Sequence, residues 1–232
     1  MYTKEQQIEV INLYKKFSLK EVVKIYKINK GTLLNILKKN GIVTRNRGQQ
    51  RKWSLNESFF EKIDTQEKAY FLGLMFADGN NYPKRGLIQI NLQECDKNIL
   101  ETFSSMIFNE NRKLTFIKKQ RESCKNQFCL RINSYKMSQD LINLGCVAAK
   151  SKILQFPTEE QVPKHLIHHF IRGYFDGDGS IWLRKQDNQL YFGFLGTENF
   201  ISNIQNCIFE AGLPLNKIRE VSTSIGTYRL TY

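Results

Sequence analysis

The chain has 232 residues, of which 41% are hydrophobic and 25% are charged, so most of it can fold around a sizeable core. Its formal net charge of +13 favours a polyanionic partner such as a nucleic acid. No stretch approaches the roughly 18 apolar residues of a membrane span, and the amino terminus lacks a signal-peptide apolar region, which argues against membrane and secreted proteins. The cysteines are odd in number and include no C-x-x-C pair, which predicts reduced thiols in the cytoplasm or an organellar matrix. They are Cys95, Cys124, Cys129, Cys146 and Cys207.

Residues 1–43 predict a small helical module with a strong positive charge. The first 60 residues contain thirteen Lys or Arg against four Glu, so about a quarter of the chain carries most of the positive excess. Apolar residues recur at helical spacing from Ile8 to Phe17. Ser18 and Glu21 then form a capping box for a second helix over residues 19–26.

A third helix is expected over residues 32–40, after a break at residues 28–31, and Gly41 is a natural stop. Such spacing is typical of a helix-turn-helix, and the segment resembles the tri-helical modules of resolvases and invertases. The third helix would then lie in the major groove of DNA. Its candidate contact residues are Thr32, Asn35, Lys38 and Lys39, together with Lys30 in the break that precedes it; Leu33 lies on the same expected helix. The alternative is a helical cap whose lysines face only solvent.

Residues 44–53 predict an extended basic linker, because Thr44 to Lys52 includes no apolar residue. Basic arms of this kind often follow the minor groove, so the arginines of the linker are candidate DNA contacts. They are Arg45, Arg47 and Arg51. The alternative is an ordinary hydrophilic tether.

The rest of the chain is an internal repeat with an offset of one hundred residues. FLGLMFADG at residues 71–79 corresponds to IRGYFDGDG at residues 171–179, and QFCLRI at 127–132 aligns with TYRLTY at 227–232. We therefore expect an α+β fold in which two copies, residues 54–146 and 147–232, share the order α-β-β-α-β-β-α. The final helix of the second copy would fall beyond residue 232.

Hydrophobic periodicity predicts where these elements lie. In the first copy, helices are expected over residues 66–77, 96–107 and 135–144, and strands over 87–92, 113–118 and 127–132. In the second copy, helices are expected over residues 162–176 and 198–211, and strands over 180–184, 190–195, 217–221 and 227–232.

Each repeated motif is the end of a helix with small residues on one face. Gly73 and Ala77 are four residues apart, as are Gly173 and Gly177, so each pair shares a helix face. Glycine within a helix costs about 1 kcal/mol relative to alanine. Close approach of the two helices is a physical reason for that cost, and we expect these faces to pack together.

Asp78 and Asp178 would then lie side by side at two helix carboxyl termini. Carboxylates there oppose the helix dipole and repel each other. Mg²⁺ or another divalent cation would relieve this conflict, because hard cations prefer carboxylate oxygens completed by water and phosphate. Cations held in this way promote phosphodiester hydrolysis.

The two motifs resemble those of the LAGLIDADG homing endonucleases in their single-chain, two-repeat form, and the resemblance covers roughly residues 54–232. It implies a saddle of two antiparallel sheets that straddles double-stranded DNA and cuts both strands. The metal-binding acid at the eighth motif position carries over to Asp78 and Asp178. The first motif departs from the name-giving sequence at Phe76, where the second retains Asp176; that position is not a metal ligand in the family.

Further candidate residues are less strongly indicated. Lys150 stands where family members often carry a basic residue near the reacting phosphates, so it is a candidate transition-state stabiliser; the alternative is a surface lysine. Basic residues on the expected strands are candidate DNA contacts, although the sequence does not determine which sheet face they occupy. They are Arg131, Arg184, Lys185, Arg219 and Arg229. His165, His168 and His169 lack the cysteine or carboxylate that would complete a zinc site, and we expect them on an exposed helical face.

The sequence as a whole predicts a monomeric DNA endonuclease of the homing type that uses Mg²⁺ and whose affinity depends strongly on salt. Such a protein can be intron-encoded, intein-encoded or free-standing, and the sequence leaves these three open. One alternative is a DNA-binding regulator or an intron RNA maturase of the same fold without cleavage activity. A second is a recombinase-like protein, suggested by the first 45 residues alone, but the repeat gives no Ser or Tyr nucleophile a special place.

Overall fold

A computed structural model describes residues 2–42, 44, 54–108, 113–119, 125–148, 150–186 and 188–232. The chain divides into two compact units, Met1–Lys52 and Trp53–Tyr232, and each has its own hydrophobic core. The linker residues Arg45, Arg47 and Arg51 lie outside the described residues. No helix within the described ranges is both long enough and apolar enough to cross a membrane.

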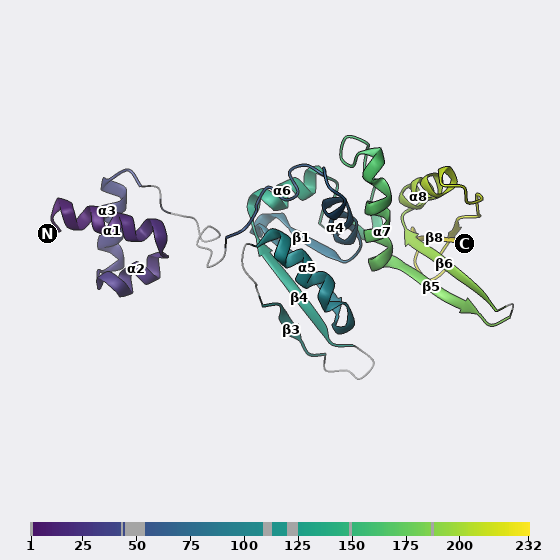
Figure 1. Cartoon of the computed structure of the whole chain (residues 1–232), viewed down its shortest axis with the longest axis horizontal. Coiled ribbons are helices and arrows are strands. Elements are labelled where there is room, and N and C mark those ends of the chain that lie inside the picture. Colours follow the sequence, from purple (N-terminus) through teal and green to yellow (C-terminus); the bar gives the residue numbers. More distant parts are fainter. Residues whose placement is uncertain are drawn as a thin grey trace. The chain divides into compact units, whose positions relative to one another are not determined.

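The amino-terminal unit consists of helices α1 (Lys4–Lys16), α2 (Leu19–Tyr26) and α3 (Lys30–Lys39) (Figure 1). The predicted capping box is present, because Ser18 Oγ accepts from Glu21 N and the Glu21 carboxylate accepts from Ser18 N. Helix α3 begins earlier than expected, at Lys30, because Asn29 caps it by accepting a hydrogen bond from Gly31 N at 2.8 Å.

The core of this unit combines one face of each helix. Its buried residues are Val10, Tyr14, Leu19, Val22, Ile28, Leu33, Ile36 and Leu37. The expected apolar stripe on the first helix is wrong at its start, since Ile8 is 58% exposed. Leu33 is fully buried, because the third helix packs through it against the other two.

Helices α4 (Gln66–Ala77) and α7 (Ile167–Asp178) pack side by side at the centre of the second unit (Figure 1). A methyl group at Gly73 would lie 2.0 Å from the Phe170 carbonyl oxygen, and one at Gly173 would lie 1.9 Å from that of Tyr70. The predicted packing through small residues is therefore confirmed, because only glycine admits backbones this close.

The limits expected for helix α7 need correction at both ends. Residues 162–166 are not part of it, because Pro163 is followed by a short 3₁₀ turn, Lys164–Leu166. At the other end the helix continues to Asp178 instead of stopping at residue 176.

The first sheet contains β1 (Gly79–Tyr82), β2 (Leu87–Gln93), β3 (Thr115–Ile117) and β4 (Gln127–Asn133), in the antiparallel order β1-β2-β4-β3. Strand β1 is absent from the expected strands; it follows Asp78 directly, without a turn to mark its start. Helices α5 (Lys97–Ile107) and α6 (Tyr135–Asn143) cover one face of this sheet. Ile88 and Ile90 point to that face and are buried, whereas Gln89 and Asn91 lie on the other.

The second sheet contains β5 (Gly179–Arg184), β6 (Gln189–Gly196), β7 (Arg219–Glu220) and β8 (Tyr228–Thr231), in the antiparallel order β5-β6-β8-β7. Helix α8 (Glu198–Glu210) packs on it. The equivalent strand orders confirm the duplicated α+β plan. The β5–β6 hairpin extends beyond α8 (Figure 1), which leaves Ile181, Leu183 and Leu190 exposed.

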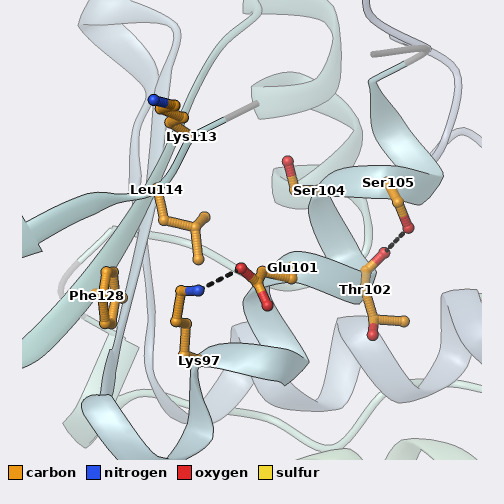
Figure 2. Close-up of a pocket in the computed structure, with 8 residues that line it drawn as sticks. All are labelled: Lys97, Glu101, Thr102, Ser104, Ser105, Lys113, Leu114 and Phe128. Carbon is orange, nitrogen blue, oxygen red and sulfur yellow. Dashed lines mark hydrogen bonds and ion pairs between the residues drawn. The ribbon is translucent and has the colours of Figure 1, made fainter. Parts of the chain in front are cut away.

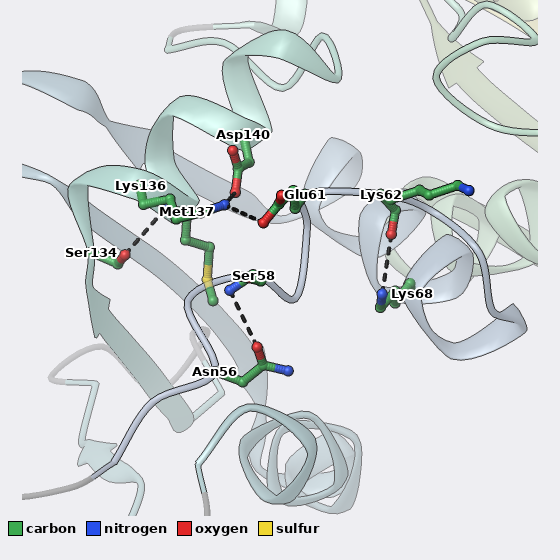
Figure 3. Close-up of polar contacts among 9 residues, drawn as sticks. All are labelled: Asn56, Ser58, Glu61, Lys62, Lys68, Ser134, Lys136, Met137 and Asp140. Carbon is green, nitrogen blue, oxygen red and sulfur yellow. Dashed lines mark hydrogen bonds and ion pairs between the residues drawn. The ribbon is translucent and has the colours of Figure 1, made fainter.

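The segment that precedes α4, which includes Phe60 and Glu61, contacts α6 through an ion pair. Lys136 Nζ lies 2.7 Å from Glu61 Oε2 and 3.0 Å from Asp140 Oδ2 (Figure 3). Exposed ion pairs of this kind contribute little to stability because solvent screens them, so burial of Phe60 is the stronger anchor. Helix α4 itself begins after Thr65, whose side chain accepts a hydrogen bond from Lys68 N.

Candidate active site

Asp78 and Asp178 lie at the adjoining ends of the two central helices. Asp78 caps α4, its N–H donating to Leu74 O at 2.9 Å, and Asp178 is the last residue of α7. A methyl group at Gly177 would lie 2.4 Å from Ala77 Cβ and 3.0 Å from Asp78 Oδ2. The end of α7 at Gly177 is thus in contact with Ala77 and Asp78 at the end of α4.

The electrostatics of this pair are unfavourable without a counter-ion. Desolvation and then the nearby Asp178 raise the pKa of Asp78 to about 6. Desolvation also raises the pKa of Asp178, although its side chain is exposed on one side. The positive charge of Lys150 opposes both shifts.

Lys150 is buried beside these aspartates, with only 8% of its surface exposed. It begins a 3₁₀ turn, Lys150–Lys152, and its ammonium donates to the carbonyl oxygen of Gly79, the residue that follows Asp78. The alternative interpretation as a surface lysine is therefore wrong. Its part in catalysis stays a proposal.

Asn81 and Cys146, which the sequence analysis did not assign to the site, position the chain segment that precedes Lys150. Asn81 is buried, and its Nδ2 donates to Ser138 O at 2.9 Å and to Cys146 O at 3.2 Å. The Cys146 thiol donates to Met75 O at 3.5 Å, which ties the segment to α4. The sequence offered no signal for this bridge, because no strand was expected at Gly79–Tyr82 and the inward face of Asn81 follows only from the fold.

Tyr174 is a further missed residue near Asp178. Its hydroxyl donates to Leu195 O at 2.7 Å, and its contact with the Asp178 carboxylate opposes the rise in the pKa of that group. Burial raises the pKa of Tyr174 itself. The available signal was spacing, because a residue four positions before Asp178 shares its helix face. The first copy has Leu74 there, so the two halves of the site differ.

The helix pair shows the same asymmetry at another position. Tyr70 Oη donates to Asp176 Oδ2 at 2.7 Å, joining α4 to α7. The equivalent pair in the other direction is Phe76 and Phe170, whose rings meet edge to face with centroids 5.0 Å apart. Phe76 is buried, so its departure from the motif replaces a polar bridge with an aromatic one.

The residues predicted to contact DNA occupy two regions. In the amino-terminal unit, Lys30, Asn35, Lys38 and Lys39 are exposed on α3, and Thr32 is partly exposed. In the second unit, the strand arginines are exposed; they are Arg131, Arg184, Arg219 and Arg229. Lys185 is not on a strand, because β5 ends at Arg184 and Lys185 lies in the turn that follows.

The face of the first sheet opposite its helices carries amide side chains. Gln89 Nε2 donates to Asn91 Oδ1 at 3.2 Å, and Arg131 Nε donates to Gln89 Oε1 at 3.3 Å across the strand pair. Amides and arginines are the side chains that pair with base edges in the major groove. This face is therefore chemically suited to reading duplex DNA.

A pocket of about 790 Å³ lies elsewhere, between α5, strand β4 and the residues Lys113 and Leu114 that lead into β3 (Figure 2). Its lining includes the ion pair of Lys97 and Glu101, 2.6 Å apart, and the ring of Phe128. None of the predicted site residues lines it. The convergent charged groups are at the motif aspartates instead.

The aspartate pair fits a divalent cation by its chemistry. No group of three or more His, Cys, Asp or Glu side chains converges anywhere in the part of the chain that the structure describes. Mg²⁺ does not require such a group, because it commonly binds one or two carboxylates and completes its shell with water and substrate phosphate. Burial first, and then the charge of Asp178, raises the pKa of Asp78, and a bound cation would offset both of these causes. The histidines lie around the other end of α7, where the rings of His168 and His169 are 4.0 Å apart.

No protein-family model and no curated protein matches the chain. Among solved structures, the meganuclease I-CpaMI bound to uncleaved DNA is 13% identical, with 71% of this chain and 78% of that chain covered and a TM-score of 0.41. A variant of I-DmoI in complex with nicked target DNA and manganese is 18% identical, with 75% and 88% covered and a TM-score of 0.42. Most of the similar structures are LAGLIDADG homing endonucleases.

The LAGLIDADG resemblance expected from the two motifs is thus found again among solved structures, over about 75% of the chain. Full-length DUF199/WhiA from Thermatoga maritima is also similar, at 14% identity, with 75% of this chain and 54% of that chain covered and a TM-score of 0.46. At these identities the LAGLIDADG likeness concerns the fold alone.

Proposed function

We propose that this chain is a metal-dependent endonuclease that hydrolyses phosphodiester bonds of double-stranded DNA with one aspartate from each repeat. The observation that carries the proposal is the contact between two helix ends that brings Asp78 and Asp178 together beside the buried Lys150. Because one chain supplies both halves of the site, a monomer suffices for the reaction.

In this proposal the two aspartates and Lys150 have different roles. Asp78 and Asp178 would hold Mg²⁺ or another divalent cation, which when bound activates water and stabilises the leaving oxygen. Lys150 lowers the pKa of both carboxylates and so favours the ionised form that a cation needs. Its ammonium also offers a fixed positive charge to the phosphate in the transition state.

The first sheet and helix α3 offer surfaces that are suited to binding duplex DNA. The amide and arginine face of the first sheet supplies hydrogen-bonding groups for base edges. In the amino-terminal unit, Asn35, Lys38 and Lys39 are exposed on α3, which we propose lies in the major groove and lengthens the contact.

The test uses a randomised duplex DNA library with Mg²⁺ and sequencing of the cut ends. The unmutated protein should give specific ends, and the double variant Asp78→Asn/Asp178→Asn should give none. The matched control is Asp176→Asn. This variant also loses a carboxylate from α7, but Asp176 bonds to Tyr70 and is not one of the two motif aspartates, so the variant should still cut DNA. If the unmutated protein binds DNA without cutting it, the chain is a DNA-binding protein and the proposed chemistry is wrong.

A further inference from the structure

The pocket of Figure 2 is bordered by a buried hydroxyl group. Ser104 lies on the buried side of α5, lines the pocket and is only 3% exposed. Its Oγ forms no hydrogen bond with any described residue, whereas the hydroxyls of Thr102 and Ser105 donate to carbonyl oxygens of their own helix. A hydroxyl group that leaves water without gaining a partner costs free energy, so a polar ligand group at this position would be favoured.

The second repeat satisfies the equivalent position from within its own chain. Three buried residues recur at the same spacing in the two helices, Leu100, Phe103 and Ser104 in α5 and Ile201, Ile204 and Gln205 in α8. Gln205 therefore corresponds to Ser104. Its Nε2 donates to the carbonyl oxygen of Asn216, in the segment ahead of β7, and Asn216 Nδ2 donates to Thr231 O at 2.8 Å. The first repeat has a shorter side chain at this position and a pocket beside it.

The lining of the pocket combines a small excess of positive charge with an apolar wall. It contains two lysines and one glutamate, a net charge of +1. Lys97 is already paired with Glu101 at 2.6 Å, and its ammonium lies 5.3 Å from the centroid of the Phe128 ring. Lys113 has no ion-pair partner among the described residues, so it is the cation available to a ligand. The apolar wall consists of Phe128 and Leu114.

This pocket is separate from the surfaces proposed to contact DNA. Phe128 pairs with Leu92, and both lie on the face of the first sheet that α5 covers. Gln89 and Arg131 point to the opposite face, because side chains alternate along each strand. A molecule in the pocket would therefore leave the amide and arginine face free.

We propose that this pocket binds a small apolar carboxylate, with its charged group held by Lys113 and Ser104 and its apolar body against Phe128 and Leu114. A volume of about 790 Å³ is within the range of small-molecule sites, roughly 300 to 1,000 Å³. A single negative charge matches the net charge of the lining, and an ionised carboxylate can accept hydrogen bonds from both a hydroxyl and an ammonium. The ligand would join α5 to the segment ahead of β3, as Gln205 joins α8 to the segment ahead of β7.

Calorimetric titration of the full-length protein with 2-naphthoate tests this proposal. The probe should bind at one saturable site. Its neutral analogue 2-naphthamide should bind at least about tenfold more weakly, because it lacks the charge that Lys113 recognises. Acetate should also bind at least about tenfold more weakly, because it lacks the apolar body. Absence of saturable 2-naphthoate binding, or equal binding of 2-naphthamide, would overturn the proposal.

Variants then locate the binding site. Ser104→Gln introduces the side chain of the second repeat and should abolish 2-naphthoate binding, with thermal unfolding as the check that the variant folds. Lys113→Gln changes an exposed residue and should weaken binding about tenfold. Lys118→Gln is the matched control, because Lys118 is exposed just after β3 and outside the lining, so its affinity should be unchanged.

A last variant keeps this result distinct from the nuclease proposal. The double variant Asp78→Asn/Asp178→Asn should bind 2-naphthoate like the unmutated protein, because neither aspartate lines the pocket. Loss of cleavage with retained 2-naphthoate binding in this variant supports both proposals independently. An affinity for 2-naphthoate that is unaltered in Lys113→Gln would show that the probe binds elsewhere and would contradict the proposed site.

Discussion

At the scale of single residues, Asp78 holds its negative charge in a place that disfavours it. Its pKa is about 6 in the folded chain, against an ordinary value of 3.8, so the folded state binds a proton more tightly than the unfolded state. Stability from this group is therefore greatest below the unfolded pKa and is lost as pH rises through about 6. If the pair binds a cation as we propose, neutralisation of the two carboxylates would restore the lost stability.

We predict that Asp78→Asn raises the melting temperature of the metal-free protein at pH 8, because it removes the unfavourable charge. The gain should shrink as pH falls through about 6, where the carboxyl of the unmutated protein takes up its proton. Thermal unfolding in chelator between pH 5 and pH 8 measures this. Added Mg²⁺ should stabilise only the unmutated protein. A gain of the same size at every pH would show that Asp78 carries no such penalty.

We predict that Lys150→Met raises the pKa of both aspartates further, since the positive charge that lowers them is gone. Cation binding should then require a higher pH, and cleavage should fall by about 100-fold. Calorimetric titration of Mg²⁺ at several pH values and single-turnover cleavage measure the two effects. Lys152→Met is the matched control, because Lys152 is exposed in the same turn. If the two variants behaved identically, Lys150 would have no specific role in cation binding or cleavage.

At the scale of elements, the contact between α4 and α7 positions the chemistry. The two helices touch backbone to backbone at Gly73 and Gly173, so their far ends meet at Asp78 and Asp178. The two symmetry-related contacts between these helices differ in kind. Tyr70 donates a hydrogen bond to Asp176, whereas the rings of Phe76 and Phe170 pack against each other. Duplication has preserved the packing while the side-chain chemistry has diverged.

We predict that Gly73→Ala or Gly173→Ala destabilises the second unit by about 3 kcal/mol or more, because the new methyl group would overlap a backbone carbonyl. Urea unfolding measures the loss. Asn206→Ala introduces alanine at an exposed position of α8 and should leave stability nearly unchanged. Variants that unfold like this control would mean that the helices can separate without cost.

At the scale of the whole molecule, positive charge is spread over two units with separate cores. The net charge of +13 favours DNA at any surface, so charge alone does not show which helix contacts it. A test must therefore compare lysines on different helices while it removes the same number of charges. The amino-terminal unit permits this, because α2 and α3 both carry exposed lysines.

We predict that Lys38→Gln/Lys39→Gln lowers duplex affinity and reduces the slope of log affinity against log salt by about 1 to 2, since α3 would lose phosphate contacts. Fluorescence anisotropy with a labelled duplex at several salt concentrations measures the slope. Lys20→Gln/Lys24→Gln removes the same charge from α2 and should change the slope less. Equal effects of the two double variants would contradict a specific role for α3.

The sequence by itself determined the duplicated α+β order, the helix contact through glycine and the pairing of Asp78 with Asp178. These follow from periodicity, from the cost of glycine within a helix and from repetition of one motif, all of which are local or symmetric properties. Only the tertiary structure decided the burial of Lys150 and the bridge from Asn81 to Cys146.

The stacking of Trp182 on Tyr191 was likewise decided by the fold, as was the sheet face of each strand arginine. Such contacts join residues that are distant in the chain. A shift of one residue in strand register would turn every one of these side chains to the other face, and strand pairing and loop path in the folded chain set that register.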